Sequence, residues 1–106
     1  MIIIGEKING AIPSTGKAIA AKDAEFIRNL AIKQTEAGAN FIDVCASVDD
    51  DIELETMKWL IDIVQDATDV PIAVDSPNVY TCIESMKYCN KPGLFNISSI
   101  QCRYRH

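Results

Sequence analysis

The stretch Ile2-Ile3-Ile4-Gly5-Glu6 is a short apolar run that ends on a carboxylate. The pattern returns three times along the chain, in Phe41-Ile42-Asp43, Ile72-Ala73-Val74-Asp75 and Leu94-Phe95-Asn96. The segments between these runs have helical character, and strands that alternate with helices predict a parallel sheet with covered faces. Ligands in such folds bind at the carboxyl ends of the strands. We therefore expect the polar residues that end the runs to share one rim and to hold a polar small molecule: Glu6, Asp43, Asp75 and Asn96.

Periodicity and capping residues predict three helices, at about 23–37, 52–67 and 78–88. Asp23 is a candidate N-cap, and Gly38 suits the left-handed position after the last turn of the first helix. The strands are expected at 2–4, 40–44, 72–74 and 94–96. The first strand is a continuous β-branched run, which is typical of a strand buried on both faces. Residues 7–16 contain Asn9-Gly10, Pro13 and Gly16, which predicts a loop.

The composition is that of an ordinary globular domain, because 48% of the 106 residues are hydrophobic and 24% are charged. The net charge of −5 and the absence of a basic stripe argue against nucleic-acid binding. The opening apolar run is too short for a signal peptide or a membrane span, so we expect a cytoplasmic protein that does not contact a membrane.

The motif content excludes several kinds of active site. The chain contains neither G-x-G-x-x-G nor G-x-x-x-x-G-K-[ST], and its single histidine is the last residue, His106. Its four cysteines form no C-x-x-C pair, which predicts reduced thiols and no metal site: Cys45, Cys82, Cys89 and Cys102. The acidic run at 49–51 could coordinate a cation, and the alternative is an exposed helix start favoured by the helix dipole.

Five segments in order resemble one family. They are Ile3-Ile4-Gly5-Glu6-Lys7-Ile8-Asn9-Gly10, Gly38-Ala39-Asn40-Phe41-Ile42-Asp43-Val44, Met57-Lys58-Trp59-Leu60, Val74-Asp75-Ser76 and Phe95-Asn96. The ordered set resembles the methyltetrahydrofolate:corrinoid methyltransferases, relatives of dihydropteroate synthase among the pterin-binding TIM barrels. This resemblance implies an α/β fold in which residues 1–98 are parallel βα units that form the first half of a TIM (β/α)8 barrel. Residues 99–106 do not resemble the family and would be an atypical tail.

The resemblance also implies a reaction and its participants. A methyl group would pass between methyltetrahydrofolate and the cobalt of a cobalamin that a partner corrinoid protein carries. The pterin would be bound by Asp75, Asn96, Asp43, Glu6 and Asn9. Asn96 would also be catalytic, because a donor near the methyl-bearing ring nitrogen stabilises charge as it develops there.

Other interpretations stay open at the level of the sequence. Asp43 and Asp75 could cap the helices that follow them, and the Asn9-Gly10 turn could be purely local. Cys45 stands where relatives often carry asparagine, and only four of eight barrel units are visible. The chain could therefore be a non-catalytic half-barrel module that self-associates, because inner-face residues such as Ile3, Ile42 and Val74 would lack an opposing wall. A third alternative is a flavodoxin-like α/β domain.

Overall fold

The computed structural model describes residues 2–89 and the strand residues 94–95. In chain order the elements are β1 (Ile4–Asn9), α1 (Pro13–Ala20), α2 (Ala24–Glu36), β2 (Phe41–Cys45), α3 (Asp50–Ala67), β3 (Ile72–Val74), α4 (Val79–Tyr88) and β4 (Leu94–Phe95). Within these residues the strands form one sheet in the order β1-β2-β3-β4, and all three pairings are parallel. The predicted parallel sheet is therefore confirmed, and its strands follow the order of the chain.

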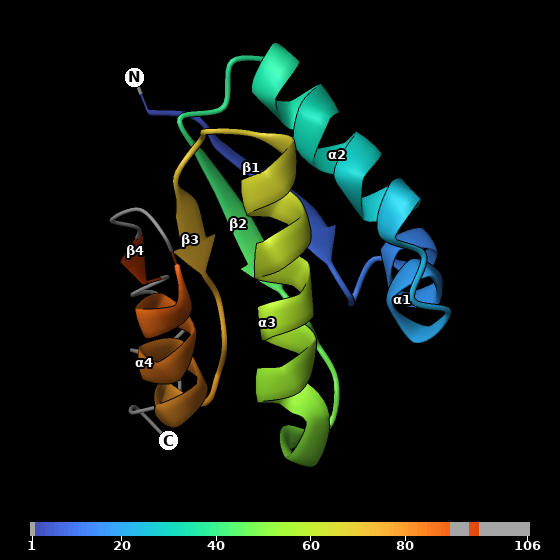
Figure 1. Ribbon diagram of the computed structural model, residues 1–106, viewed down its shortest axis with the longest axis vertical. Helices are drawn as coiled ribbons and strands as arrows, with labels where there is room; N and C mark the ends of the chain where they lie inside the picture. The colour runs from blue at the N-terminus through green and yellow to red at the C-terminus, as the bar shows by residue number, and fades with distance from the viewer. Residues whose placement is uncertain (1, 90–93, 96–106) are drawn as a thin grey trace.

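All the described helices lie on one side of the sheet (Figure 1). Successive helices pack side by side, because α1 contacts α2, α2 contacts α3, and α3 contacts α4. A doubly wound flavodoxin-like fold would place helices on both faces, so this alternative does not describe the chain. Alternating β/α units with the helices in a single outer layer are the arrangement of part of a TIM barrel.

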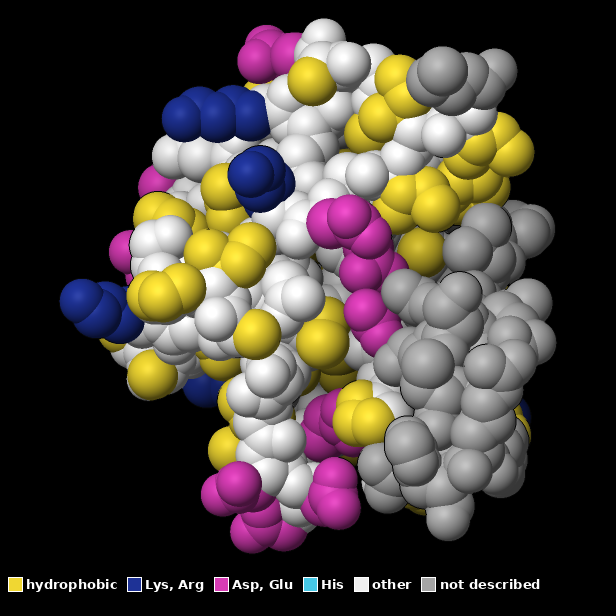
Figure 2. Space-filling model, turned by 180° about the vertical axis from the view of Figure 1, so that it is seen from behind, with side chains coloured by type: hydrophobic (Ala, Val, Ile, Leu, Met, Phe, Trp, Pro, Cys, Tyr) yellow, Lys and Arg dark blue, Asp and Glu magenta, His cyan; other side chains and the backbone are white. Residues whose placement is uncertain are grey.

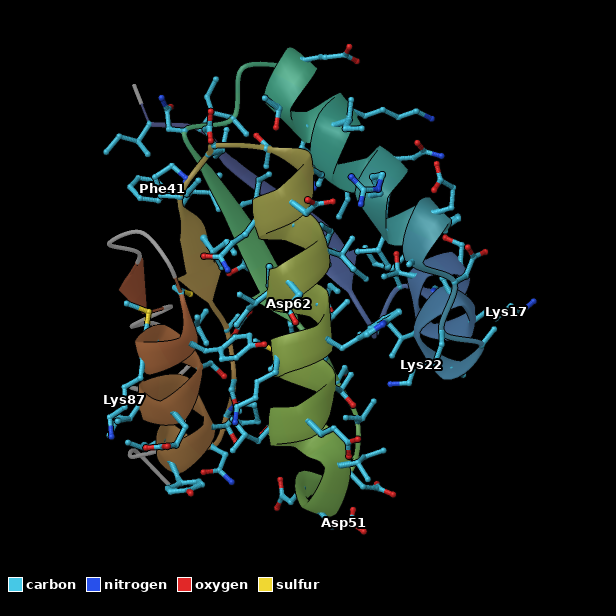
Figure 3. The ribbon with its side chains drawn as sticks, viewed as in Figure 1. Lys17, Lys22, Phe41, Asp51, Asp62 and Lys87 are labelled. Carbon is cyan, nitrogen blue, oxygen red and sulfur yellow. The ribbon has the colours of Figure 1, made fainter. Side chains whose placement is uncertain are left out.

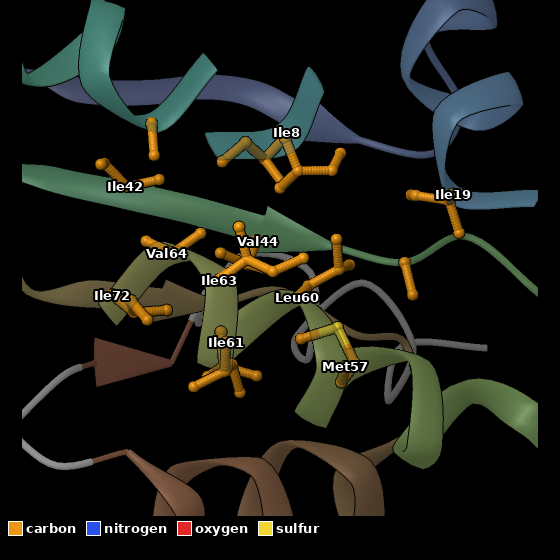
Figure 4. Packing of buried hydrophobic residues seen from close by; sticks show 14 of the residues in the cluster. Ile8, Ile19, Ile42, Val44, Met57, Leu60, Ile61, Ile63, Val64 and Ile72 are labelled. Atoms are coloured by element: carbon orange, nitrogen blue, oxygen red, sulfur yellow. The ribbon is translucent and has the colours of Figure 1, made fainter. Parts of the chain in front are cut away.

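The core lies between the sheet and α3 (Figure 4). Helix α3 has an apolar stripe whose members are fully buried: Met57, Leu60, Ile61 and Val64. They pack against side chains that alternate along the strands, including Ile42, Val44 and Val74. Burial of one such side chain stabilises the fold by roughly 1.5–3 kcal/mol. The expectation that Ile42 and Val74 line an uncovered inner face was wrong, because both point toward the helices.

The first strand differs most from its prediction. It starts at Ile4 rather than Ile2 and continues to Asn9 through residues expected to form a loop. Its beginning is not buried on both faces: Ile2 is 70% exposed, and Ile3 and Ile4 are each 45% exposed. The physical reason is its position at the edge of the sheet, where β2 covers one side of the strand and no described strand covers the other.

A helix that the sequence analysis missed follows β1. Helix α1 begins at Pro13, a residue that suits a first helical position, and its N-cap residue Ile12 makes no side-chain capping bond. Its buried residues Thr15, Ala18 and Ile19 have helical spacing.

The boundaries of α2, α3 and α4 agree with the sequence to within two residues. Asp23 caps α2 by accepting a hydrogen bond from the backbone N–H of Phe26 at 3.2 Å. Gly38 has φ +93° and ends the same helix, as predicted. Its N–H donates to the carbonyl of Thr35, and the N–H of Ala39 donates to that of Gln34, which is the Schellman arrangement.

Candidate functional site

Three residues lie at one level of the sheet, where neighbouring strands end: Asn9 and Cys45 are the last residues of β1 and β2, and Asp75 follows β3. Asn9 pairs with Cys45 in the register of β1 and β2. Val44 pairs with Val74, and the N–H of Asp75 donates to the carbonyl of Val44 at 3.0 Å, so Asp75 lies beside Cys45. Neighbouring strands lie about 4.8 Å apart, which places the backbones of Asn9 and Asp75 about 10 Å apart. We call these half-buried residues the rim row.

Glu6 and Asp43 lie deeper, within strands rather than at their ends. Asp43 pairs with Ala73, two residues before the rim row, and is only 4% exposed. Glu6 lies between Gly5, which pairs with Ile42, and Ile8, which pairs with Val44. The prediction that Glu6 ends its strand was therefore wrong, and Asn9 has that position. Figure 2 shows acidic side chains along the middle of the face turned away from the helices.

A β-bulge determines the position of Glu6. The register between β1 and β2 shifts between Gly5 and Ile8, so β1 carries one more residue than β2 there. Gln34 of α2 stabilises the bulge, because its Oε1 accepts the N–H of Lys7 at 3.0 Å. Gln34 fits only because residue 5 is glycine, since a Cβ there would lie 2.4 Å from that same oxygen.

The sequence left open that Asp43 and Asp75 cap helices and that Asn9 only makes a local turn, and the structure answers these questions differently. Asp43 and Asp75 do not cap the following helices, because Asp49 and Asn78 are the N-cap residues of α3 and α4. Asn9, in contrast, makes the local turn, since its Oδ1 accepts the N–H of Ala11 at 2.9 Å.

Burial and the nearby carboxylates change the pKa of the Cys45 thiol. Burial raises the pKa of the Cys45 thiol to about 12, and the carboxylates of Asp75, Asp43 and Glu53 add to this effect. The thiol is therefore protonated at neutral pH. Cys45, Cys82 and Cys89 are all free thiols, and Cys102 lies outside the described residues.

Glu53 is a residue that the sequence analysis missed. It lies in the first turn of α3, is 2% exposed, and its Oε2 accepts a hydrogen bond from the Ser76 hydroxyl at 2.7 Å. A signal was present in the sequence: position 53 precedes Met57 by four residues and Leu60 by seven, so it continues the apolar stripe of α3. A carboxylate at a core position of a helix indicates a specific partner.

The acidic start of α3 lies at the same end of the molecule as the rim row. Asp51 is labelled there in Figure 3, whereas Phe41, which begins β2, is at the other end. Asp49, Asp50 and Asp51 are exposed, as expected for a helix start. In the part of the chain that the structure describes, no group of three or more His, Cys, Asp or Glu residues is arranged to hold a metal ion.

A cavity of about 290 Å³ lies beside the rim, between α1 and α3. Gly10, Ala46 and Ile52 are among its lining residues, but Glu6, Asp43 and Asp75 are not. The described residues therefore form a polar surface at the rim and a separate, mainly apolar cavity next to it.

Asn96 lies outside the described residues, so its position relative to Asp75 stays a prediction. Residues 99–106, which we expect to be an atypical tail, also lie outside the described residues. Among the helices within 2–89, none combines the length and the apolarity needed to cross a bilayer.

Comparison with known proteins relates the chain to a methyltransferase. No protein-family model matches the chain. The chain is 55% identical over 96 residues to a methylcorrinoid:tetrahydrofolate methyltransferase from Eubacterium limosum. The match covers 91% of this chain and 35% of that relative, so the chain spans about a third of the length of the relative. The chain is therefore homologous to part of a methylcorrinoid:tetrahydrofolate methyltransferase, in agreement with the family that its strand ends resemble.

Proposed function

We propose that this chain is the pterin-binding part of a methyltransferase that moves a methyl group between methyltetrahydrofolate and the cobalt of a corrinoid on a partner protein. Residues 1–98 would be the first half of its barrel. The observation that carries the proposal is the position of Asp75 at the rim of the sheet, in a chain homologous to part of such an enzyme. No hydrogen bond from the described side chains reaches the Asp75 carboxylate, so it is available to a ligand.

The chemistry of a pterin suits this carboxylate. The amino group and the adjacent ring N–H of a pterin can both donate to one carboxylate, and such charge-assisted bonds are strong. Asp43 lies two residues deeper on the same face and would accept a further bond from the ligand. Glu6 and Asn9 would contact the ligand from β1, with the free amide group of Asn9 as a donor, because its Oδ1 is occupied by the local turn.

Asn96 would provide the catalytic contact. The methyl group leaves a ring nitrogen, and a donor that binds this nitrogen more strongly as charge develops lowers the barrier. Cobalamin, when its partner protein brings it to the rim, supplies the nucleophilic cobalt(I) that accepts the methyl group or the methyl-cobalt bond that provides it.

A chimera tests this proposal. The matching segment of this chain replaces the corresponding third of the E. limosum relative, and methyl transfer to cobalamin is followed by the visible spectrum of the cobalt. We expect the chimera to be active. Asp75→Ala should weaken methyltetrahydrofolate binding, whereas Asn96→Ala should lower the transfer rate by about 10²–10³ with a smaller effect on binding. A folded chimera that does not bind methyltetrahydrofolate would refute the proposal.

A second candidate is a half-barrel module that forms homo-oligomers. It is favoured by the exposed side chains of Ile2, Ile3 and Ile4 at the β1 edge, next to a cavity of about 470 Å³. An uncovered strand edge is a template for pairing with another chain. Light scattering on the 106-residue chain should show association that Ile3→Lys reduces. A monomer at tens of micromolar, an order of magnitude suited to weak contacts, would argue against this candidate.

A further inference from the structure

We infer that Glu53 is a positioning residue that fixes the direction of the Asp75 carboxylate through Ser76. This inference rests on the proposed function, because it concerns how the same rim holds its ligand. It starts from the contrast between two carboxylates. Asp75 is half-buried and has no hydrogen bond from the described side chains, whereas Glu53 is 2% exposed and is bonded to the residue that follows Asp75.

Ser76 is held from several sides. Its hydroxyl donates to Glu53 Oε2 at 2.7 Å and accepts the N–H of Asn78 at 3.0 Å. Its carbonyl accepts a bond from the thiol of Cys82 at 3.4 Å. Because the N–H of Asp75 is already bonded to β2, the backbone on both sides of the Asp75 side chain is fixed. The direction of Asp75 therefore depends on contacts of the backbone and of its neighbour Ser76.

Among these contacts of Ser76, the bond to Glu53 is the one that comes from another helix. The bonds to Asn78 and Cys82 lie within the β3–α4 segment and would move with it. The bond to Glu53 connects this segment to α3, whose stripe is packed into the core. Because α3 is packed into the core, the bond from Glu53 holds the turn that carries Asp75 in a fixed position relative to the core.

The second carboxylate oxygen of Glu53 indicates that a contribution to the stability of the fold does not by itself explain why this residue is a glutamate. Glu53 Oε1 is buried and has no hydrogen-bond partner among the described residues. A buried polar atom without a partner destabilises the folded state, and replacement of a buried ionic group by an apolar one is often neutral or stabilising. Ser76 would not lose its only acceptor, since its hydroxyl also lies 3.3 Å from the carbonyl oxygen of Asn78.

The experiment separates the effect of Glu53 on the stability of the fold from its effect on the position of Ser76. In the 106-residue chain, Glu53→Met should keep or raise the resistance to urea, yet amide exchange at the Asn78 N–H should become about tenfold faster, the effect of losing one strong hydrogen bond. Glu53→Gln keeps an acceptor for Ser76 and should preserve the protection. Thr56→Val is the matched control, because Thr56 is buried in the same helix and, within the described residues, its hydroxyl bonds only to the carbonyl of Ile52.

The active chimera provides the functional measurement. Glu53→Met should weaken methyltetrahydrofolate binding about tenfold, Glu53→Gln should restore most of it, and Ser76→Ala should add little in the Glu53→Met background. Equal binding by the Met and Gln variants, or a loss that simply follows stability, would overturn the inference. An inactive unmodified chimera would instead count against the proposed function, while the exchange measurement on the 106-residue chain would still decide the role of Glu53.

Discussion

Substitution of Gly10 by alanine should destabilise the chain strongly, because two loops meet at this residue. The N–H of Gly10 donates to the carbonyl of Cys45 at 2.9 Å, and a Cβ on Gly10 would lie 2.0 Å from the backbone oxygen of Ala46. A backbone atom cannot rotate away as a side chain can. The β1–α1 and β2–α3 loops must therefore separate.

The cost has two parts. Overpacking of a close contact typically costs about 1–3 kcal/mol, and the weakened Gly10–Cys45 hydrogen bond adds about 1 kcal/mol. We expect a total of roughly 2–4 kcal/mol. With a urea dependence near 2 kcal/mol per molar, the unfolding midpoint should fall by about 1–2 M. Separation of the loops should also expose Cys45, which alkylation detects.

Gly38→Ala is the control for this prediction. Gly38 has φ +93°, and a Cβ on this residue would meet no described atom within 4 Å, so alanine there causes backbone strain without a clash. It should cost about 1–2 kcal/mol and leave the reactivity of Cys45 unchanged. A smaller loss of stability for Gly10→Ala than for Gly38→Ala would refute the reasoning about the loop contact.

Three further results are expected. Cys45 should react slowly with iodoacetamide at pH 8, because a thiol with a pKa of about 12 stays protonated, and Asp75→Asn should lower that pKa and speed the reaction in peptide mapping by mass spectrometry. Leu60→Ala should destabilise the chain by about 2–5 kcal/mol in urea unfolding, since Leu60 is fully buried against the sheet. The 106-residue chain alone should bind methyltetrahydrofolate poorly, because it supplies only part of the rim, and tight binding in calorimetry would contradict this.

The elements with strong periodicity could be predicted from the sequence. The stripe of α3 and the cap at Asp23 depend on neighbours three to seven positions away, so the pattern is visible locally. The parallel sheet could be predicted because helical segments separate each apolar run from the next. Gly38 could be placed because few residues other than glycine adopt its backbone conformation.

The start of the chain could not be predicted in the same way. The bulge in β1 depends on Gln34, which lies 27 residues from Lys7, and no local pattern reveals that contact. Helix α1 was not predicted because the segment from Asn9 to Gly16 is rich in turn residues. Its Pro13 is compatible with both a loop and a first helical turn.

At the site, sequence reasoning identified the strand ends but not their level in the sheet. It placed Glu6 at the rim, since the extension of β1 to Asn9 depends on pairing with Cys45. It treated Cys45 as a departure from the family, whereas the register places that residue between Asn9 and Asp75. Glu53 was missed because its partner, Ser76, lies 23 residues away.

Among the described strands, each one after β1 pairs with the strand that precedes it in the chain, so each pairing requires only the β/α unit that has just been completed. During synthesis, β1 and β2 can pair, with α2 packed on them, before α3 has left the ribosome. Each later strand can then pair with the edge strand that is already in place. Each parallel pairing still closes a long crossover, such as the one between Ile4 and its partner Phe41, so the pairing of a new strand is the slow step in adding each unit. The chain can thus be built up one unit at a time, with the newest edge as the template for the next strand.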